Sequence, residues 1–216
     1  MNRFLSLAGA GAWAIATALL LPSPAHAQCE PPLGCPSEGN SLSPSAIMLV
    51  GHDGSGAPDP GGQFKVVLRL AHNPLANAVV RIQLQATDVT FCSSQQAGLV
   101  LHLPDAMEGI TDATGTFTAS LKGFGTGPAS HVAGGPAAAL ILGNGVLVAQ
   151  VNMMALDLDG SGGAGINDLS VWLTDFGSGL QYLRGDLDYS GSLGINDLSV
   201  WLTLYGKGLS SVGCSP

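Results

Sequence analysis

Short apolar runs separated by Gly, Pro and Asn fill the middle of the chain. In several of them apolar and polar residues alternate, as Val80, Ile82 and Leu84 alternate with Arg81 and Gln83. A period of two is typical of strands with one buried face. Strands are therefore predicted at residues 46–50, 64–70, 78–84, 89–92, 99–103, 116–121, 137–142 and 146–151.

The spacing of these runs indicates how the strands are organised. Turn residues separate them, and no long helical pattern interrupts residues 45–152. This arrangement favours an antiparallel β-sandwich, with an all-β barrel as the alternative. In either fold two apolar faces have to meet, because a single sheet would leave one of its faces in water.

Two stretches of this region resemble bacterial immunoglobulin-like modules. Residues 73–80 (Asn-Pro-Leu-Ala-Asn-Ala-Val-Val) resemble a run that enters a strand, and residues 111–117 (Thr-Asp-Ala-Thr-Gly-Thr-Phe) resemble a hairpin. In the hairpin, the Asp112 carboxylate can accept hydrogen bonds from backbone amides, and Gly115 can take a positive φ. The resemblance implies an immunoglobulin-like sandwich, although similar hairpins occur in prealbumin-like and other sandwiches.

After residue 152 the chain contains an internal duplication. Residues 157–180 recur as residues 186–209, and 18 of the 24 aligned positions are identical. Repetition at this level indicates paired structural units. Each copy contains Ile-Asn-Asp-Leu-Ser-Val-Trp-Leu-Thr, which predicts a short helix.

Apolar residues fall three or four apart in each predicted helix, so each helix has one apolar stripe. Asn167 and Asn196 are predicted to cap the helix starts, and Gly177 and Gly206 to mark the ends. Because the stripes are too broad to leave exposed, the two helices are expected to pack on each other, with Trp172 and Trp201 at the seam. The stripes consist of Ile166, Leu169, Trp172, Leu173 and Phe176 and of Ile195, Leu198, Trp201, Leu202 and Tyr205.

The start of each repeat has the residue types of a calcium-binding loop. Calcium takes six to eight oxygen ligands, and a sharply turning loop can supply them from alternate positions. Acids or hydroxyls occupy loop positions one, three, five and twelve, glycine occupies position six, and position seven offers a backbone carbonyl. The alternative is an ordinary helical hairpin with Asp-rich turns. The predicted ligands of two calcium ions are Asp157, Asp159, Ser161, Gly163 and Asp168, and Asp186, Asp188, Ser190, Ser192 and Asp197.

Both loops depart from the EF-hand pattern at two positions. Asp replaces the usual bidentate Glu at position twelve, and Ser replaces an acid at position five. A shorter carboxylate and an uncharged hydroxyl weaken binding. We therefore expect dissociation constants of about 10⁻⁴ to 10⁻³ M, which suit extracellular calcium levels.

A calcium loop followed by one helix, in two copies, resembles a type I dockerin domain. The resemblance covers residues 157–208, with the Asp-x-Asp-x-Ser-Gly loop, Asp at position twelve and the following Leu169 or Leu198. It implies a small all-α domain over residues 153–216, the same side-chain ligands, and a possible protein partner, because dockerins bind cohesin modules. Cohesin-binding dockerins carry small hydroxyl residues at loop positions ten and eleven, whereas this chain has Ile-Asn, so the calcium fold carries over but the partner does not.

The first 27 residues have the layout of a secretory signal peptide. A charged start with Arg3 precedes an apolar run at residues 4–21, and small residues precede a cleavage site after Ala27. The prediction is a secreted chain, extracellular, at the cell surface or periplasmic, and an uncleaved membrane anchor is the alternative. Residues 28–44 form a Pro/Gly-rich lead segment.

Net charge and cysteine content indicate which binding partners the chain can have and in which compartment it occurs. The net charge is −8, and seven of the Asp residues lie between Asp157 and Asp197, which disfavours nucleic acid and acidic membranes and favours a divalent cation. Disulfides can form in an exported chain. The spacing of the four cysteines favours Cys29 with Cys35 and Cys92 with Cys214, although three pairings are possible.

The chain has no recognisable catalytic constellation. The histidines lack metal-ligand spacing, and scattered solvent-facing positions are expected for His52, His72, His102 and His131. The acids of the β region are expected in turns, and that region has no Trp or Tyr for sugar stacking. The prediction is a non-enzymatic display or adhesion module. The alternative is a carbohydrate-binding or polysaccharide-degrading accessory protein that its tail attaches to a scaffold.

Overall fold

The computed structural model describes residues 41–51, 62–102 and 105–206, and within them the protein is mainly β with two helices. The elements are β1 (Ala46–Val50), β2 (Gln63–Val67), β3 (Arg69–Leu70), β4 (Asn73–Pro74), β5 (Val79–Leu84), β6 (Val89–Phe91), β7 (Val100–His102), β8 (Ala106–Ile110), β9 (Thr116–Gly125), β10 (Ala139–Gly143), β11 (Val146–Ala155), α1 (Ile166–Gly177), the 3-10 helix η3 (Leu183–Gly185) and α2 (Ile195–Tyr205).

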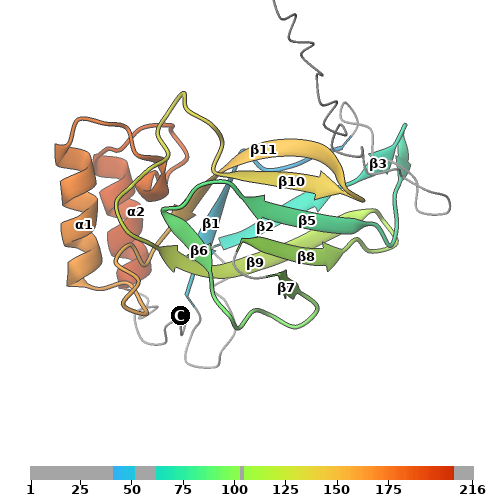
Figure 1. The fold of residues 1–216 in the computed structure, drawn as a ribbon, viewed down its shortest axis with the longest axis horizontal. Coiled ribbons are helices and arrows are strands. Elements are labelled where there is room, and N and C mark those ends of the chain that lie inside the picture. The colour runs from blue at the N-terminus through green and yellow to red at the C-terminus, as the bar shows by residue number, and fades with distance from the viewer. Residues whose placement is uncertain (1–40, 52–61, 103–104, 207–216) are drawn as a thin grey trace, which may run out of the picture.

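One curled, mixed sheet contains most of the strands (Figure 1). Its order is β2-β9-β1-β11-β10-β5-β8-β7, with β6 paired to the far end of β9. The two longest strands each change partner along their length. β9 pairs successively with β2, β1 and β6, and β11 pairs first with β10 and then with β1. These changes of partner let the sheet curl around one apolar interior.

The prediction of a wholly antiparallel arrangement is wrong for β1. This strand lies between β9 and β11 and runs parallel to both, with Leu49 opposite Leu121 and Ala46 opposite Asn152. Parallel neighbours need long connections, and here more than sixty residues separate β1 from β9. Alternation of apolar and polar residues does not specify strand direction, so the sequence could not show this. The immunoglobulin-like sandwich stays a prediction.

All eight predicted apolar runs contain strands, the two-residue strand β4 was not predicted, and the strand at β8 was missed. Its sequence Ala-Met-Glu-Gly-Ile does not alternate cleanly, and glycine is unfavourable in strands. The structure explains Gly109, because a Cβ atom there would lie 2.2 Å from Cε2 of Phe117. Close packing of Gly109 against the ring of Phe117 therefore explains why glycine occupies this position.

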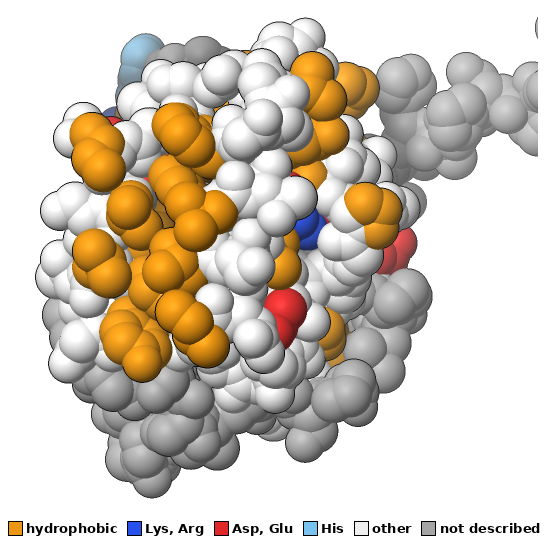
Figure 2. Space-filling view, turned by 90° about the vertical axis from the view of Figure 1, so that its left-hand side faces the viewer, with side chains coloured by type: hydrophobic (Ala, Val, Ile, Leu, Met, Phe, Trp, Pro, Cys, Tyr) orange, Lys and Arg blue, Asp and Glu red, His pale blue; other side chains and the backbone are white. Residues whose placement is uncertain are grey.

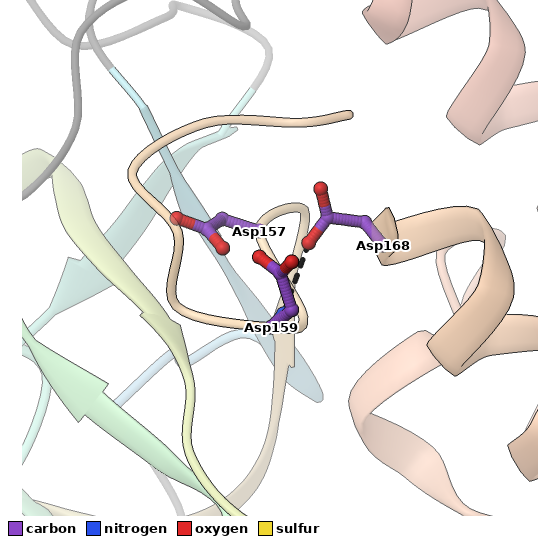
Figure 3. A group of neighbouring side chains, drawn as sticks. All are labelled: Asp157, Asp159 and Asp168. Atoms are coloured by element: carbon purple, nitrogen blue, oxygen red, sulfur yellow. Dashed lines mark hydrogen bonds between the residues drawn. The ribbon is translucent and has the colours of Figure 1, made fainter. Parts of the chain in front are cut away.

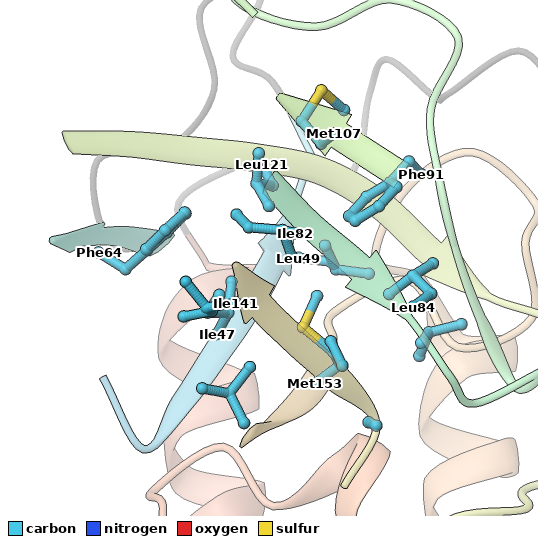
Figure 4. Close-up of a cluster of buried hydrophobic side chains, with 14 of the residues drawn as sticks. Ile47, Leu49, Phe64, Ile82, Leu84, Phe91, Met107, Leu121, Ile141 and Met153 are labelled. Carbon is cyan, nitrogen blue, oxygen red and sulfur yellow. The ribbon is translucent and has the colours of Figure 1, made fainter. Parts of the chain in front are cut away.

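The apolar core has two parts, one on each face of β1 and β11. Ile47, Leu49 and Met153 point into the main cluster inside the curled sheet (Figure 4). On the opposite face, Met48 and Met154 belong to a second cluster that includes residues of α2. Helix α2 therefore covers a sheet face that would otherwise be exposed. The predicted domain boundary at residue 152 falls inside β11.

The helices lie where the sequence predicts them, but their caps and packing differ. Gly165 and Gly194, not the following asparagines, are the N-cap residues. Trp172 joins the main cluster and Trp201 the second one, so the predicted tryptophan seam is wrong. The predicted stripes also stay largely outside the core: only the two tryptophans among them are buried, and the exposed members are Ile166, Leu173, Phe176, Ile195, Leu202 and Tyr205.

Several predictions fall on residues outside the described part of the chain. They concern the signal peptide, nearly all of the lead segment, His52, and the cysteines at positions 29, 35 and 214. Cys92 is buried and disulfide-bonded, and the predicted pairings stay predictions. Within the described residues, neither helix has the length and apolar content to cross a bilayer.

Candidate metal centre

The first loop begins directly after β11 and is held against the end of β9. The carbonyl oxygen of Asp157 accepts a hydrogen bond of 2.6 Å from the backbone N–H of Gly125. Gly160 has a φ of +70°, and a Cβ atom there would lie 3.0 Å from Cδ2 of Phe124. The loop therefore turns sharply beside the sheet, with glycine where the ring of Phe124 leaves no space.

Three carboxylates of the first loop converge on one point (Figure 3). Asp157, Asp159 and Asp168 each offer an oxygen, and these oxygens lie within 4.8 Å of one another. Asp157 and Asp168 are buried and Asp159 is exposed. Solvent therefore reaches the cluster at Asp159.

Backbone N–H groups of the loop and of the helix start orient these carboxylates. Asp157 accepts hydrogen bonds from Gly160 (2.8 Å) and Gly162 (2.9 Å), one on each oxygen. Asp168, in the first turn of α1, accepts from the backbone N–H groups of Leu158, Asp159 and Gly165. Asp168 therefore joins the two ends of the loop.

The second loop repeats this geometry after η3. Asp186, Asp188 and Asp197 form a triad within the same 4.8 Å limit. Asp186 accepts from Ser190 (2.9 Å) and Gly191 (2.7 Å). Asp197 accepts from Asp188 (2.9 Å) and from Gly194 (2.7 Å), the residue that precedes α2.

The remaining predicted ligands lie in the loops beside these triads. Ser161 donates its backbone N–H to Asp159, and Gly163 is buried in the same loop. In the second loop the hydroxyl of Ser190 lies 3.0 Å from the carbonyl oxygen of Ser192. The structure thus brings the six predicted carboxylates together in two groups of three.

Burial and mutual repulsion make the buried carboxylates of each triad costly to ionise without a cation. Burial, and then the charge of Asp168, raise the pKa of Asp157 to about 6. Burial also raises the pKa of Asp168 and, in the second loop, those of Asp186 and Asp197. A bound cation would offset this cost, because it attracts the ionised form.

The donor set fits a hard divalent cation. All the donors are carboxylate, hydroxyl or carbonyl oxygens, which calcium prefers, and no Cys or His belongs to either triad. Three carboxylates per loop exceed the charge of one calcium ion. These residues could hold calcium, with the exposed side of each triad left for water.

Sequence reasoning missed a buried hydrogen-bonded pair of side chains in the β region. His131 was expected to face solvent, but it is buried and its Nδ1 lies 2.7 Å from Oδ1 of Asp88. Burial tends to raise the pKa of Asp88, but hydrogen bonds from His131 and the backbone of Ser130 outweigh it and lower that pKa to about 2. The two residues are 43 positions apart, and no local pattern links them.

The chain was compared with protein-family models, curated proteins and solved structures, and none of the three comparisons gives a match.

Proposed function

We propose that this protein is a secreted, non-enzymatic calcium-binding protein with a mainly β display or adhesion region. Its tail would use two calcium ions for structural stabilisation or for calcium-dependent protein interaction. The immunoglobulin-like identity of the β region and the dockerin-like identity of the tail belong to the same proposal. The observation that carries it is the pair of matching Asp triads, each assembled by one loop and the first turn of one helix.

The position of the loops supports a stabilising role for calcium. Asp157 follows β11 and hydrogen-bonds to the end of β9, while Asp168 lies in the first turn of α1. An ion held by both residues would link the sheet to the helix. Because it would bind the folded chain and not the unfolded one, it would raise the free energy of unfolding.

The test is calcium titration of the full chain, because the tail shares its core with the sheet. Isothermal titration is expected to show two sites, with dissociation constants of about 10⁻⁴ to 10⁻³ M. Asp159→Asn and Asp188→Asn should each abolish one site. Both changes keep a side-chain oxygen that can accept hydrogen bonds from the N–H groups of the loop.

The matched control is Asp105→Asn, which removes an exposed carboxylate of the β region and should leave both sites intact. Magnesium, which prefers stricter octahedral geometry, should bind more weakly. The proposal would be contradicted if a chain that circular dichroism shows to be folded gave no heat of calcium binding in the titration. Equal binding by the wild type and the two loop variants would contradict it as well.

A further inference from the structure

The imidazole of His131 lies between acceptor oxygens from two distant parts of the chain. His131 is buried in the loop between β9 and β10. Its Nδ1 lies 2.7 Å from Oδ1 and 2.9 Å from Oδ2 of Asp88, and its Nε2 lies 2.9 Å from the carbonyl oxygen of Met153 in β11. A carbonyl oxygen and an ionised carboxylate can only accept hydrogen bonds. Each ring nitrogen therefore needs its own N–H.

The surroundings of Asp88 keep its carboxyl group ionised. Its Oδ2 also accepts hydrogen bonds from the backbone N–H groups of Ser130 (2.7 Å) and His131 (3.2 Å). Burial tends to raise the pKa of Asp88, but the hydrogen bonds from His131 and Ser130 outweigh it and lower that pKa to about 2. A neutral imidazole has a single N–H, so one of its nitrogens would face an oxygen with no proton between them, which is costly in a buried site.

Asp88 is the acid that the described structure places against His131. Strand β11 contains no titratable side chain. The linker that packs on the loop contributes Tyr182 and Arg184, and Arg184 is paired with Asp175 of α1. The side of the molecule that the two helices form shows mainly hydrophobic and uncharged side chains (Figure 2). The second proton of the imidazole is therefore stabilised chiefly by Asp88.

The loop that contains His131 also holds the linker between the two Asp triads. The backbone N–H of Leu183 donates to the carbonyl of His131 at 3.1 Å, and the N–H of Ala133 donates to the carbonyl of Gln181 at 2.9 Å. The side chain of Gln181 in turn accepts a hydrogen bond of 3.0 Å from the backbone N–H of Leu193, in the second loop. Holding this loop on the sheet therefore also positions the linker.

We propose that Asp88 and His131 form a pH-sensitive latch that holds the loop between β9 and β10, and with it the linker, on the sheet. The latch is closed while both ring nitrogens carry a proton. When the ring gives its second proton to solvent, one nitrogen presents a lone pair to an oxygen, and the loop and the linker are released. Because the closed form binds one more proton than the released form, the latch opens as the pH rises.

Nuclear magnetic resonance of the full chain in excess calcium tests the latch. Long-range ¹H–¹⁵N spectra count the N–H groups of the His131 ring, and hydrogen exchange measures the protection of the Ala133 and Leu183 amides, corrected for the pH dependence of intrinsic exchange. As the pH is raised from about 5, the ring should lose its second N–H. Over the same pH range, the protection of both amides should fall at least about tenfold.

The variant Asp88→Asn separates the role of the proton from that of packing. Its amide keeps an oxygen for the N–H of Ser130 and can direct its NH₂ group at Nδ1, so a neutral ring with one N–H, on Nε2, satisfies every contact. This variant should keep the linker amides protected at every pH. The matched control is His102→Gln, which removes an exposed imidazole that lies 3.0 Å from Glu108 and should leave the pH dependence of the wild type unchanged.

Three results would overturn the latch. One is a His131 ring with a single N–H while the linker amides remain protected, and another is protection that persists after the ring has lost its second proton. The third is an Asp88→Asn chain whose linker opens at the same pH as in the wild type. The two measurements on the wild type decide the question even if a variant does not fold. None of them uses the heat of calcium binding, so the latch and the proposed function fail independently.

Discussion

The two repeats have nearly the same sequence but different surroundings. Trp172 of α1 reaches the main core and donates its indole N–H to the carbonyl of Gly185 at 3.1 Å. Trp201 of α2 lies in the second cluster, on the outer face of β1 and β11, and its Nε1 has no hydrogen-bond partner among the described residues. The two aligned tryptophans thus lie in different apolar clusters.

The contrast shows which differences between the repeats are structural. Asp175 of α1 receives two hydrogen bonds from Arg184, whose Nη1 also donates to the carbonyl of Gly127. The aligned residue of α2 is Leu204, which is buried in the second cluster. At this aligned position α1 is held by a buried ion pair and α2 by apolar contact, and the following predictions test that difference.

The largest effect is expected from Asp175→Leu, which gives α1 the residue of α2. Arg184 is only 2% exposed, and the substitution leaves its charge buried and unpaired. The cost should be about 3–5 kcal/mol in the free energy of unfolding, measured by urea denaturation. Adding Arg184→Met removes the unpaired charge and should restore much of the loss. A double variant as unstable as the single one would contradict this account.

The next effect concerns the apolar attachment of α2. Leu204→Ala creates a cavity beneath the helix and should lower the free energy of unfolding by about 2–4 kcal/mol. Leu202→Ala, two residues away on the exposed face, should change it by less than about 0.5 kcal/mol. Thermal unfolding of both variants at low protein concentration measures the difference. Equal losses would mean that the second cluster does not hold α2.

A pH effect of about 2 kcal/mol is expected from the first loop in calcium-free buffer. The pKa of Asp157 is about 6 in the folded chain, above its unfolded value. Its contribution to stability is therefore present below about pH 4 and lost as the pH rises through 6. Asp157→Asn should flatten this dependence in urea titrations at pH 5 and pH 7.

Calcium should reverse the same pH dependence, because it binds the ionised carboxylates. Asp186→Asn makes the matched change in the second loop, where burial raises the pKa of Asp186 as well. Stability that rises with pH in calcium-free buffer between these two values would contradict the expected sign. The lowered pKa of Asp88 does not interfere, because its contribution is lost only below about pH 4.

The smallest change in the free energy of unfolding is expected at position four of the two loops. Gly160 and Tyr189 both have positive φ, 70° and 62°, but only Gly160 is crowded by Phe124 and Gly125. Gly160→Ala should cost about 1–2 kcal/mol in the free energy of unfolding. Tyr189→Ala should change it less, because that backbone already carries a side chain. Chemical denaturation in calcium tests the pair, and a larger loss from Tyr189→Ala would contradict the argument.

Local patterns predicted much of the fold, and nonlocal contacts account for the rest. The alternating runs are strands, and the loop spacing correctly grouped the six aspartates, because both depend on residues close in the chain. The parallel insertion of β1 was not predictable from alternation. Neither was the pair of His131 with Asp88, since two separate segments form it.

The sequence by itself determined where the two loops lie and that a helix follows each one. Their carboxylates, turn residues and helix starts hydrogen-bond within about a dozen residues, so distant parts of the chain are not needed to define them. Only the tertiary structure decided which side of each helix is buried. Apolar residues occur on more than one side, and the sheet selected the side that bears Trp172 or Trp201 because its own exposed apolar surface had to be covered.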